Sequence, residues 1–333
     1  MRHTWILASC AALTAALPAS AMADSPGYPK DPTVVLYDVD PTWPQRPDTV
    51  AKFGWVSGMA LDDQEQIWLF NKGEDPVQVY QTDGTFVKTW GKGMFQDPHQ
   101  LRIDHDGNIW VADFGQHIVQ KFTPDGDLLM TLGVRGEKGD DETHFFRPTD
   151  MAIAANGDVF VTDGYGNRRI VHLDSEGNYI KSWGEYGSEP GQFVLPHAIV
   201  INNEGTLFVA DRNSGRIQLF NTDGEVLDVW SNQIMPWGLD LNTDGSLWVC
   251  GSSPHWWYRN GEYLEFKDQI LMRFNPDGRV VQNYGLPFAE EGSSIPGETR
   301  GAHCMVQDSQ GNVYIGDIYT ERAQKFVRVT SAE

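Results

Sequence analysis

Basic residues are scarce in this chain. Lys and Arg total 25 against 46 Asp and Glu, which gives a formal net charge of -21 over 333 residues. Nucleic acid and anionic lipid both carry dense negative charge, so a surface of this sign repels them. We therefore expect no nucleic-acid partner. The chain is also no disordered polyanion, because 40% of its residues are hydrophobic and 12% are aromatic.

Long hydrophobic runs are missing, apart from one near the start. Residues 5–17 are apolar, follow a basic residue and precede the small-residue motif AMA at 21–23. The run is shorter than the ~20 residues that a membrane-spanning helix needs, and the pattern is typical of a cleaved signal peptide. We predict a signal peptide over 1–23, a linker over 24–32, export to the periplasm or the extracellular space, and no membrane insertion. Cys10 could mark a lipoprotein box, but it precedes most of the apolar run, which favours the signal peptide.

Cysteines and several enzyme motifs are also missing. Only Cys250 and Cys304 follow the predicted cleavage site, and their spacing leaves open whether they pair. The chain has no P-loop, no dinucleotide fingerprint, no HExxH, no CxxC pair and no G-x-S-x-G elbow. These absences argue against nucleotide-binding enzymes, helical zinc proteases and α/β-hydrolases.

What the chain does contain is internal repetition. Five segments share a short apolar strand, a polar turn with Gly or Asn, and a second apolar strand, and one degenerate copy precedes them. The copies begin at Val56, Pro98, Pro148, Pro196, Pro236 and Ala302. Most continue into third and fourth strands joined by D-G or N-G turns, which are hairpin signals. Four-stranded units repeating every ~40–50 residues predict an all-β fold, a six-bladed β-propeller.

The predicted propeller occupies residues 33–330. Its last copy lacks a fourth strand, and the apolar segment 34–37 precedes the first copy. We predict that this N-terminal segment completes the sixth blade and closes the ring, which removes exposed strand edges. The fifth copy holds an insertion at about 252–266 that is rich in aromatic and charged residues. It is either a lid over one face or an ornamental hairpin, and the sequence leaves both open.

Histidines occupy one register of the repeat in alternate copies. From copy one to copy six, the residue after the opening Pro or its equivalent is Ser57, His99, Thr149, His197, Trp237, His303. Alternate blades of a six-fold ring are about 120° apart and the innermost strands line the channel, so three imidazoles would meet around the axis. Single histidines at strand ends are usually core residues, but three in this phase are harder to explain that way. They predict a metal site at His99, His197 and His303, with zinc the first candidate and Fe, Cu or Ni also compatible.

The loop after the second strand of each copy lies at the same end of the blade as these histidines, because the two strands are antiparallel. It carries Lys72, Tyr165 and Arg212, which we expect around the metal. A Tyr beside a metal and cations can donate or accept a proton, although it can equally be a packing residue. An Asp recurs in these loops, and its recurrence favours a structural role in turns. It stands at Asp113, Asp163, Asp211 and Asp317.

The third and fourth copies resemble a known enzyme family. The segments that carry the resemblance are FFRPTDMAIAANGDVFVTDGYGNRRI, PGQFVLPHAIVI and LFVADRNSGRIQLF. Together they are similar to the peptidyl-α-hydroxyglycine α-amidating lyases, which are NHL-repeat six-bladed propellers, and the resemblance extends over about residues 55–326. It implies a zinc lyase that cleaves the C–N bond of a C-terminal α-hydroxyglycine, leaving a peptide amide and glyoxylate.

The resemblance also implies roles for individual residues. The family's zinc ligands match His99, His197 and His303, the three residues that the repeat phase selects. Its catalytic Tyr matches Tyr165, which would take the hydroxyl proton of the substrate. Its second conserved Arg matches Arg212, and a cation would hold the substrate carboxylate while zinc acts as a Lewis acid.

The chain departs from the family pattern at the first catalytic loop. The family has its catalytic Arg in an H-R-G motif, where this chain has Asn71, Lys72 and Gly73. Lys72, as one of the expected catalytic residues, keeps the positive charge of the Arg. It cannot form the bidentate hydrogen bonds that a guanidinium makes with a carboxylate. Arg300 or Arg147 would be placed to compensate in substrate binding.

A second departure concerns the third histidine. The family motif P-H-D is replaced here by Ala302, His303 and Cys304. In the family that Asp helps to hold a structural calcium together with backbone carbonyls that would match Val56 and Leu101. The loss of the carboxylate argues against calcium in this chain.

Three functions are compatible with these features. The first is a zinc-dependent lyase acting on an α-hydroxyglycine or another carbinolamide in a peptide or small molecule. The second is a different metal-dependent hydrolase or lyase on the same platform. The third is a non-enzymatic NHL propeller that binds a peptide, glycan or protein, since the fold alone decides none of these. We expect a monomer.

Overall fold

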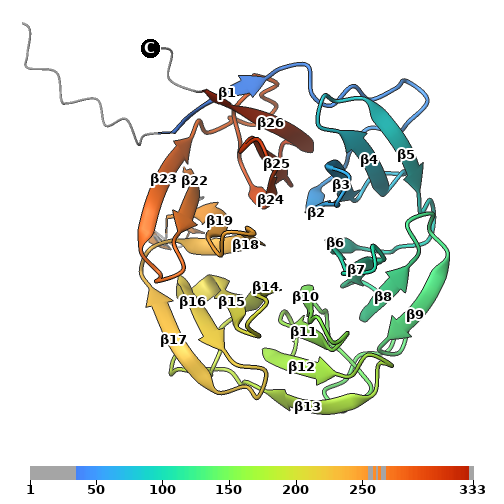
Figure 1. Cartoon of the computed structure of the whole chain (residues 1–333), viewed down its shortest axis with the longest axis vertical. Coiled ribbons are helices and arrows are strands. Elements are labelled where there is room, and N and C mark those ends of the chain that lie inside the picture. The colour runs from blue at the N-terminus through green and yellow to red at the C-terminus, as the bar shows by residue number, and fades with distance from the viewer. Residues whose placement is uncertain (1–34, 254–257, 260–261, 264–267, 330–333) are drawn as a thin grey trace, which may run out of the picture. The chain divides into compact units, whose positions relative to one another are not determined.

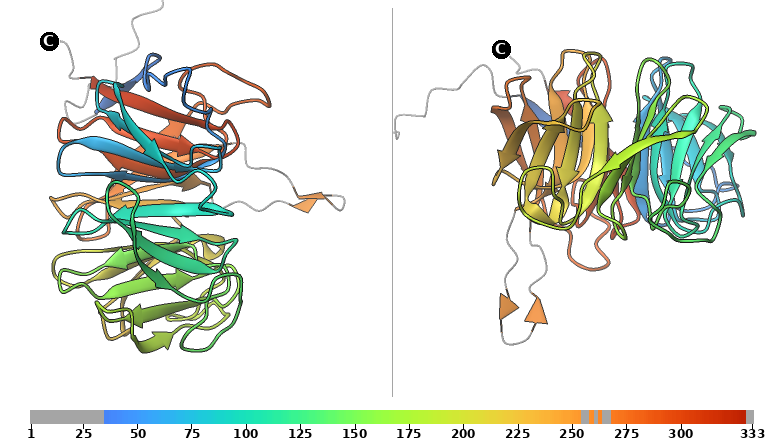
Figure 2. Two further views of the ribbon diagram at one scale, coloured as in Figure 1. Left: turned by 90° about the vertical axis from the view of Figure 1, so that its right-hand side faces the viewer. Right: turned by 90° about the horizontal axis from the view of Figure 1, so that it is seen from below.

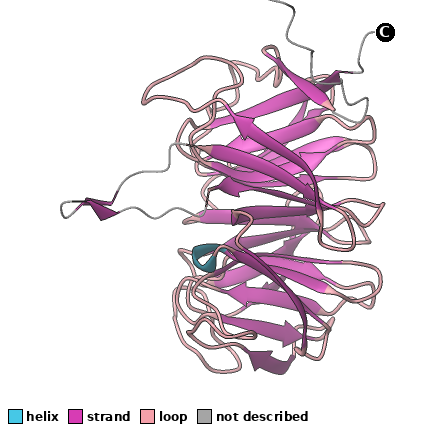
Figure 3. Cartoon of the chain, turned by 90° about the vertical axis from the view of Figure 1, so that its left-hand side faces the viewer, coloured by secondary structure: helices cyan, strands magenta, loops and turns pink. Residues whose placement is uncertain are grey.

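The computed structural model describes residues 35–253, 258–259, 262–263 and 268–329. Strands dominate this part of the chain, and its only helix is the short 3-10 helix η1 (Arg212–Ser214), as Figure 3 shows. Six four-stranded antiparallel sheets are arranged as blades around a common centre (Figure 1). Figure 2 shows the same blades from two sides, with turns gathered on both faces. The predicted all-β, six-bladed propeller is confirmed.

Blades one to three each consist of four consecutive strands. Blade one contains β2 (Val56–Leu61), β3 (Gln66–Asn71), β4 (Val77–Gln81) and β5 (Phe86–Trp90). Blade two contains β6 (Pro98–Ile103), β7 (Ile109–Asp113), β8 (Ile118–Phe122) and β9 (Leu128–Leu132). Blade three contains β10 (Asp150–Ile153), β11 (Val159–Asp163), β12 (Arg169–Leu173) and β13 (Tyr179–Trp183).

Blades four to six follow the same plan with two variations. Blade four contains β14 (Pro196–Ile201), β15 (Leu207–Asp211), β16 (Arg216–Phe220) and β17 (Val226–Ser231). Blade five contains β18 (Met235–Leu241), β19 (Leu247–Ser252), β22 (Gln269–Phe274) and β23 (Val280–Leu286). Blade six contains β24 (Ala302–Gln307), β25 (Val313–Asp317), β26 (Arg322–Val329) and, from the other end of the chain, β1 (Leu36–Asp40).

The ring closes through the N-terminal strand, as the sequence predicted. β1 pairs antiparallel with β26 over five residues, from Leu36 opposite Val329 to Asp40 opposite Lys325. The sixth blade therefore combines both ends of the propeller. Without β1, the strand β26 would expose unpaired backbone N–H and C=O groups along its outer edge.

The core lies between the blades. Each pair of neighbouring sheets encloses its own cluster of buried apolar side chains. The cluster between blades six and one contains Trp43, Val56, Tyr80, Cys304 and Tyr314. Ring closure therefore buries a sixth cluster of the same kind as the other five, and apolar burial of this sort is the main force that holds the blades together.

The first strand of every blade lies nearest the centre (Figure 1). In five of the six first strands, pairing with the second strand shifts by one residue at the same repeat position. The residues passed over are Ser57, His99, His197, Trp237 and His303. A bulge of this kind re-aims a side chain relative to the strand alternation. It explains how one repeat position can face the centre in blade after blade.

The recurring Asp of the second strand is structural. In blade four, Asp211 is fully buried and accepts hydrogen bonds from the backbone N–H groups of Val194 (3.0 Å) and Leu195 (2.9 Å). Its other oxygen pairs with the Arg216 guanidinium at 2.9 Å. The carboxylate thus ties the incoming loop to the blade. Equivalent bonds to the incoming loop are made by Asp113, Asp163 and Asp317.

We expect Asp211→Ala to lower the free energy of unfolding by about 3 kcal/mol, because it leaves the buried Arg216 guanidinium with backbone carbonyls but no carboxylate and removes the acceptor of the Val194 and Leu195 N–H groups. Equilibrium urea unfolding measures this change. The control is Asp223→Ala, which removes an exposed carboxylate that faces Lys181 and should leave the unfolding curve close to wild type. Equal effects of the two substitutions would contradict the structural role.

Some predicted segments lie outside the described residues. These are the signal peptide over 1–23 and the linker over 24–32. Of the insertion at 252–266, the structure describes mainly two short paired strands, β20 (Tyr258–Arg259) and β21 (Glu262–Tyr263). Within the described part of the chain, no helix has the length and apolar character needed to cross a bilayer.

Candidate metal centre and catalytic cavity

The three predicted histidines meet at the centre of the ring. Their ring centroids are 4.9 Å apart for His99 and His197, 4.9 Å for His197 and His303, and 5.0 Å for His99 and His303. One potential ligand atom from each lies within 4.8 Å of the others. All three side chains are buried. The nearly equal spacing follows from their common repeat position on alternate blades.

Each imidazole is oriented by the blade that follows it in the ring. Its Nδ1 lies within hydrogen-bond distance of the backbone carbonyl at the equivalent position of the next blade. The pairs are His99 with Thr149 (2.6 Å), His197 with Trp237 (2.6 Å) and His303 with Ser57 (2.8 Å). A carbonyl only accepts, so Nδ1 carries the proton and Nε2 keeps its lone pair. Histidines that ligate metals are commonly fixed in this way.

The environment also keeps the three imidazoles neutral. Burial lowers the pKa of His99 and of His197 well below the ordinary value. Burial likewise lowers the pKa of His303, to about 3. The positive charges of Arg212 and Lys72 act in the same direction on His303 and His99. Neutral nitrogens are the form that binds a metal ion, so the donor set and its protonation state fit a metal that these three residues would hold.

Tyr165 lies directly against this triad. Its hydroxyl group is 3.3 Å from Nε2 of His99 and 3.2 Å from Nε2 of His197. Arg212 Nη1 donates to the same phenolic oxygen at 3.4 Å. The guanidinium of Arg212 also lies over the Trp237 ring, 4.9 Å from its centroid. The structure therefore brings the predicted Tyr165 and Arg212 together beside the Nε2 atoms of the histidines.

Lys72 reaches the same cavity but carries a counter-ion. Its ammonium forms a salt bridge with Asp97 and lies 4.5 Å from the centre of the Trp55 ring and 4.9 Å from that of Phe114. Burial raises the pKa of Asp97, and the Lys72 ammonium opposes that rise. The positive charge of Lys72 is thus offset before any substrate arrives. Arg212, by contrast, has no carboxylate partner within the described residues.

A cavity of about 250 Å³ is lined by His99, His303, Lys72, Tyr165 and Arg212, while His197 lies behind its lining. Its walls combine the predicted polar residues with a larger share of aromatic and apolar ones than the sequence indicated. The members not selected from the sequence as site residues are Trp55, Ser57, Phe114, Trp237, Ile318 and Tyr319. Most of these residues occupy the same two repeat positions as the predicted ones, at the start of the first strand or just after the second. That shared position was the signal that could have identified them.

The two arginines predicted to assist Lys72 lie outside the cavity lining. Arg147 is exposed and its guanidinium lies over the Phe114 ring, 5.7 Å from the ring centre. The Arg300 side chain lies 4.0 Å from the Glu291 carboxylate, and its backbone N–H donates to Asp317.

The calcium implied by the resemblance does not fit the residues present. The Cys304 thiol stands where a carboxylate is required and lies 3.7 Å from the carbonyl oxygen of Val56. Burial raises the pKa of Cys304 well above the ordinary value, so it remains a neutral thiol. The buried cation Arg102 follows Leu101 in the strand and acts electrostatically on the same thiol. A neutral thiol beside a resident cation is a poor site for a second cation.

The possible pairing of the two cysteines can also be addressed. Both Cys250 and Cys304 are buried free thiols in the structure. Cys250 lies on the second strand of blade five and Cys304 on the first strand of blade six, and both belong to apolar clusters of the core. They act as small hydrophobic residues there.

Known proteins are similar to this chain in sequence and in fold. The NHL repeat family model matches residues 193–220. Peptidyl-glycine alpha-amidating monooxygenase A of Xenopus laevis is 31% identical over 332 residues, which cover 88% of this chain and 33% of that protein. A probable peptidyl-alpha-hydroxyglycine alpha-amidating lyase of Caenorhabditis elegans is 37% identical over 149 residues, which cover 44% of this chain and 43% of that protein. The chain thus spans about a third of the length of the monooxygenase relatives.

A relative of similar length is NHL repeat-containing protein 3 of Homo sapiens, which is 30% identical over 315 residues covering 89% of this chain and 86% of that protein. Among solved structures, a streptogramin B lyase superposes with a TM-score of 0.56 at 14% identity over 89% of this chain and 98% of that chain, which shows a common fold. The relatives named as amidating lyases support a lyase. The chain belongs to the family of NHL-repeat six-bladed β-propellers that includes the peptidyl-α-hydroxyglycine α-amidating lyases.

Proposed function

We propose that this protein is a metal-dependent lyase that cleaves a C-terminal peptidyl-α-hydroxyglycine, or a similar carbinolamide, to an amide and glyoxylate. The observation that carries the proposal is the convergence of three neutral imidazoles, with the Tyr165 hydroxyl group against two of them and Arg212 bonded to that hydroxyl group. Similarity to proteins named as amidating lyases supports the same reaction. We propose the full set Lys72, Tyr165 and Arg212 as the catalytic residues.

We propose that His99, His197 and His303 hold the metal, with zinc as the first candidate. A divalent ion bound there supplies Lewis-acid polarisation of a substrate oxygen. The hydrogen bonds from Nδ1 to backbone carbonyls hold each ring in one orientation before the metal arrives. This preorganisation reduces the free energy needed to assemble the ligand set.

Tyr165 and Arg212 divide the remaining tasks. In its ionised form, Tyr165 would take the hydroxyl proton of the substrate and become a neutral phenol, and the electron pair released would become the carbonyl bond of glyoxylate as the C–N bond breaks. The departing nitrogen receives a proton and leaves as the amide, and Tyr165 is placed to return that proton. Arg212 binds the carboxylate, because its charge has no carboxylate partner within the described residues.

The presence of Lys72 in place of an arginine is a reason to test other metal-dependent lyase and hydrolase reactions. Because Asp97 already neutralises its ammonium, Lys72 would hold a substrate carboxylate less firmly than a free guanidinium. A different metal-dependent lyase or hydrolase is therefore the second candidate function. Arg300 and Arg147 remain candidates for substrate binding only at the periphery of the cavity.

The decisive test is glyoxylate release from a synthetic peptide ending in α-hydroxyglycine, with and without a metal chelator. We expect release by the purified protein, loss of release in chelator and recovery on addition of one of zinc, iron, copper or nickel, but not calcium. The same peptide ending in glycine is the control and should release none. Bound metal without glyoxylate release would favour the second candidate, and absence of bound metal would favour a non-enzymatic binding propeller.

We also propose that residues 1–23 act as a signal peptide and that the protein works in the periplasm or outside the cell as a monomer, with a small-molecule or peptide substrate. The propeller over 33–330 would then follow a linker over 24–32. Mass spectrometry of protein recovered from the exported fraction tests this, and an intact N-terminus at Met1 in that fraction would contradict it.

A further inference from the structure

A second and larger cavity lies on the opposite face of the ring from the histidines. It measures about 470 Å³ and is lined by the far ends of the first strands of blades two to five and by the turns that follow them. Since a strand rises about 3.3 Å per residue, Arg102 lies roughly 10 Å along β6 from His99. The two cavities therefore open on different faces, and the far cavity is not part of the proposed catalytic site.

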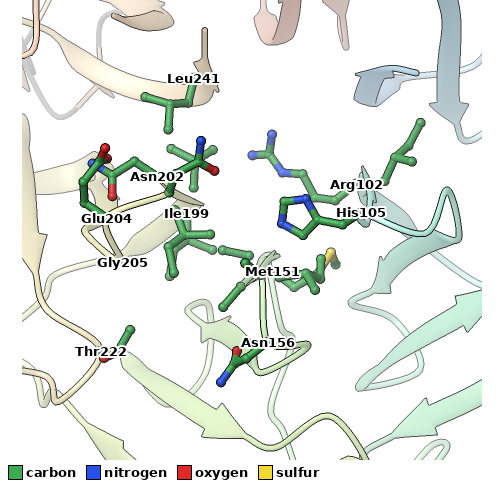
Figure 4. Close-up of a pocket in the computed structure, with 18 of the residues that line it drawn as sticks. Arg102, His105, Met151, Asn156, Ile199, Asn202, Glu204, Gly205, Thr222 and Leu241 are labelled. Atoms are coloured by element: carbon green, nitrogen blue, oxygen red, sulfur yellow. The ribbon is translucent and has the colours of Figure 1, made fainter. Parts of the chain in front are cut away.

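The far cavity is lined by both polar and apolar side chains, and Figure 4 shows Met151, Ile199 and Leu241 among the apolar ones. Its volume is in the range of pockets that hold small organic ligands. Ile103 and Ile201 add to the same lining. A ligand that fits this cavity would therefore carry an apolar group.

The charged groups that line the cavity differ in how far their charges are neutralised by neighbouring groups. Arg102 lines the cavity, and its guanidinium already has hydrogen-bond partners. It donates to both oxygens of Asp150 (3.0 and 2.6 Å), and Nη1 donates to the Leu239 carbonyl at 3.1 Å. Asp150 is buried and also accepts from backbone N–H groups, so this ion pair is complete. The positive charge of Arg102 is thus largely cancelled by its own partner.

Asp240 is different because it lines the cavity with acceptor positions to spare. The only hydrogen bond to its carboxylate within the described residues comes from the backbone N–H of Gln307, at 3.2 Å. A carboxylate has about four acceptor positions. Burial raises the pKa of Asp240 to about 6 and Arg102 opposes that rise, so the group is mostly ionised at neutral pH. Glu204 at the rim adds a second negative charge, and His105 completes the titratable lining.

Asp240 is partly buried and lies beside apolar side chains, and the burial of an ionised carboxylate costs free energy that a cationic partner offsets. We propose that the far cavity is a second ligand site, for a small organic ammonium ion with an apolar group, in which Asp240 is the counter-ion. The ammonium would fill the free acceptor positions of Asp240, and the apolar group would cover Met151, Ile199 and Leu241. This ligand class does not depend on the lyase reaction.

The test is calorimetric titration of the full-length protein with benzylammonium and with its neutral analogue benzyl alcohol. We expect benzylammonium to bind at least about tenfold more tightly, since a charge-assisted hydrogen bond is lost in the alcohol. Asp240→Asn should reduce its affinity to that of the alcohol. The matched control Asp244→Asn, in the turn beyond the cavity lining, should leave it unchanged.

A second variant keeps the proposal testable if Asp240→Asn does not fold. Ala155 is exposed at the rim, so Ala155→Trp should obstruct the cavity without disturbing the core and should weaken both ligands. Both variants should retain wild-type glyoxylate release, if that activity is found, which separates this site from the catalytic one. Equal binding of benzylammonium and benzyl alcohol to wild type, or unchanged benzylammonium binding in either variant, would overturn the proposal.

Discussion

His197→Ala is expected to remove both the bound metal and the lyase activity. The substitution deletes one of three nitrogens and leaves the Trp237 carbonyl without its donor, so the remaining two imidazoles no longer form a closed ligand set. We expect less than half an equivalent of bound metal, and a fall in glyoxylate release of about a thousandfold or more, since a catalytic metal supplies several kcal/mol of transition-state stabilisation. Elemental analysis and the glyoxylate assay measure the two effects.

The matched control is His172→Ala. His172 is also a buried histidine, but its Nε2 pairs with Asp158 at 2.8 Å and its ring stacks on Phe160 in blade three, away from the triad. This substitution should cost some stability and leave the metal content unchanged. Retention of a full equivalent of metal by His197→Ala would show that the triad is not the metal site.

Tyr165→Phe separates chemistry from metal binding. It removes one hydroxyl group and keeps the ring that packs against His99 and Phe114. We expect the metal content to be unchanged and kcat to fall by about a hundredfold to ten-thousandfold, which is the usual contribution of a positioned proton-transfer group. Metal analysis and steady-state kinetics on the same preparation measure both.

Tyr179→Phe serves as the control for this substitution. The Tyr179 hydroxyl group bonds to Ser182 on an outer strand of blade three, far from the cavity lining. Its loss should leave kcat within about twofold of wild type, as expected of a residue that makes no contact specific to the transition state. A Tyr165→Phe variant that turns over at the wild-type rate would assign the proton transfer to another group.

The sequence predicted the fold because the signal was repeated. Each copy carries its own alternating strands and turn residues. A strand that is hard to assign in one copy can therefore be assigned by comparison with the other copies. Ring closure by β1 was predictable for a similar reason, since the last copy lacked a strand and an unused apolar segment preceded the first. The phase of His99, His197 and His303 could be found because ring symmetry converts a position in a repeat into a position in space.

What the sequence did not reveal depends on contacts between different repeat positions. Asp97 precedes the first strand of blade two and meets Lys72 from blade one, and no periodicity relates these residues. The roles of Arg147 and Arg300 could not be judged either, because the direction of a long side chain depends on local packing. For Arg147 this is the ring of Phe114, and for Arg300 it is the loop that carries Glu291.

The hydrogen bonds that orient the three imidazoles have a consequence for how the protein matures. Each runs from one blade to the next, and the bond from His303 to Ser57 joins the last blade to the first across 246 residues of chain. The nitrogens therefore acquire their common orientation only once the circle is complete. Binding of a metal ion would therefore be a late event in folding, because incompletely folded chains would lack the complete set of three oriented ligands.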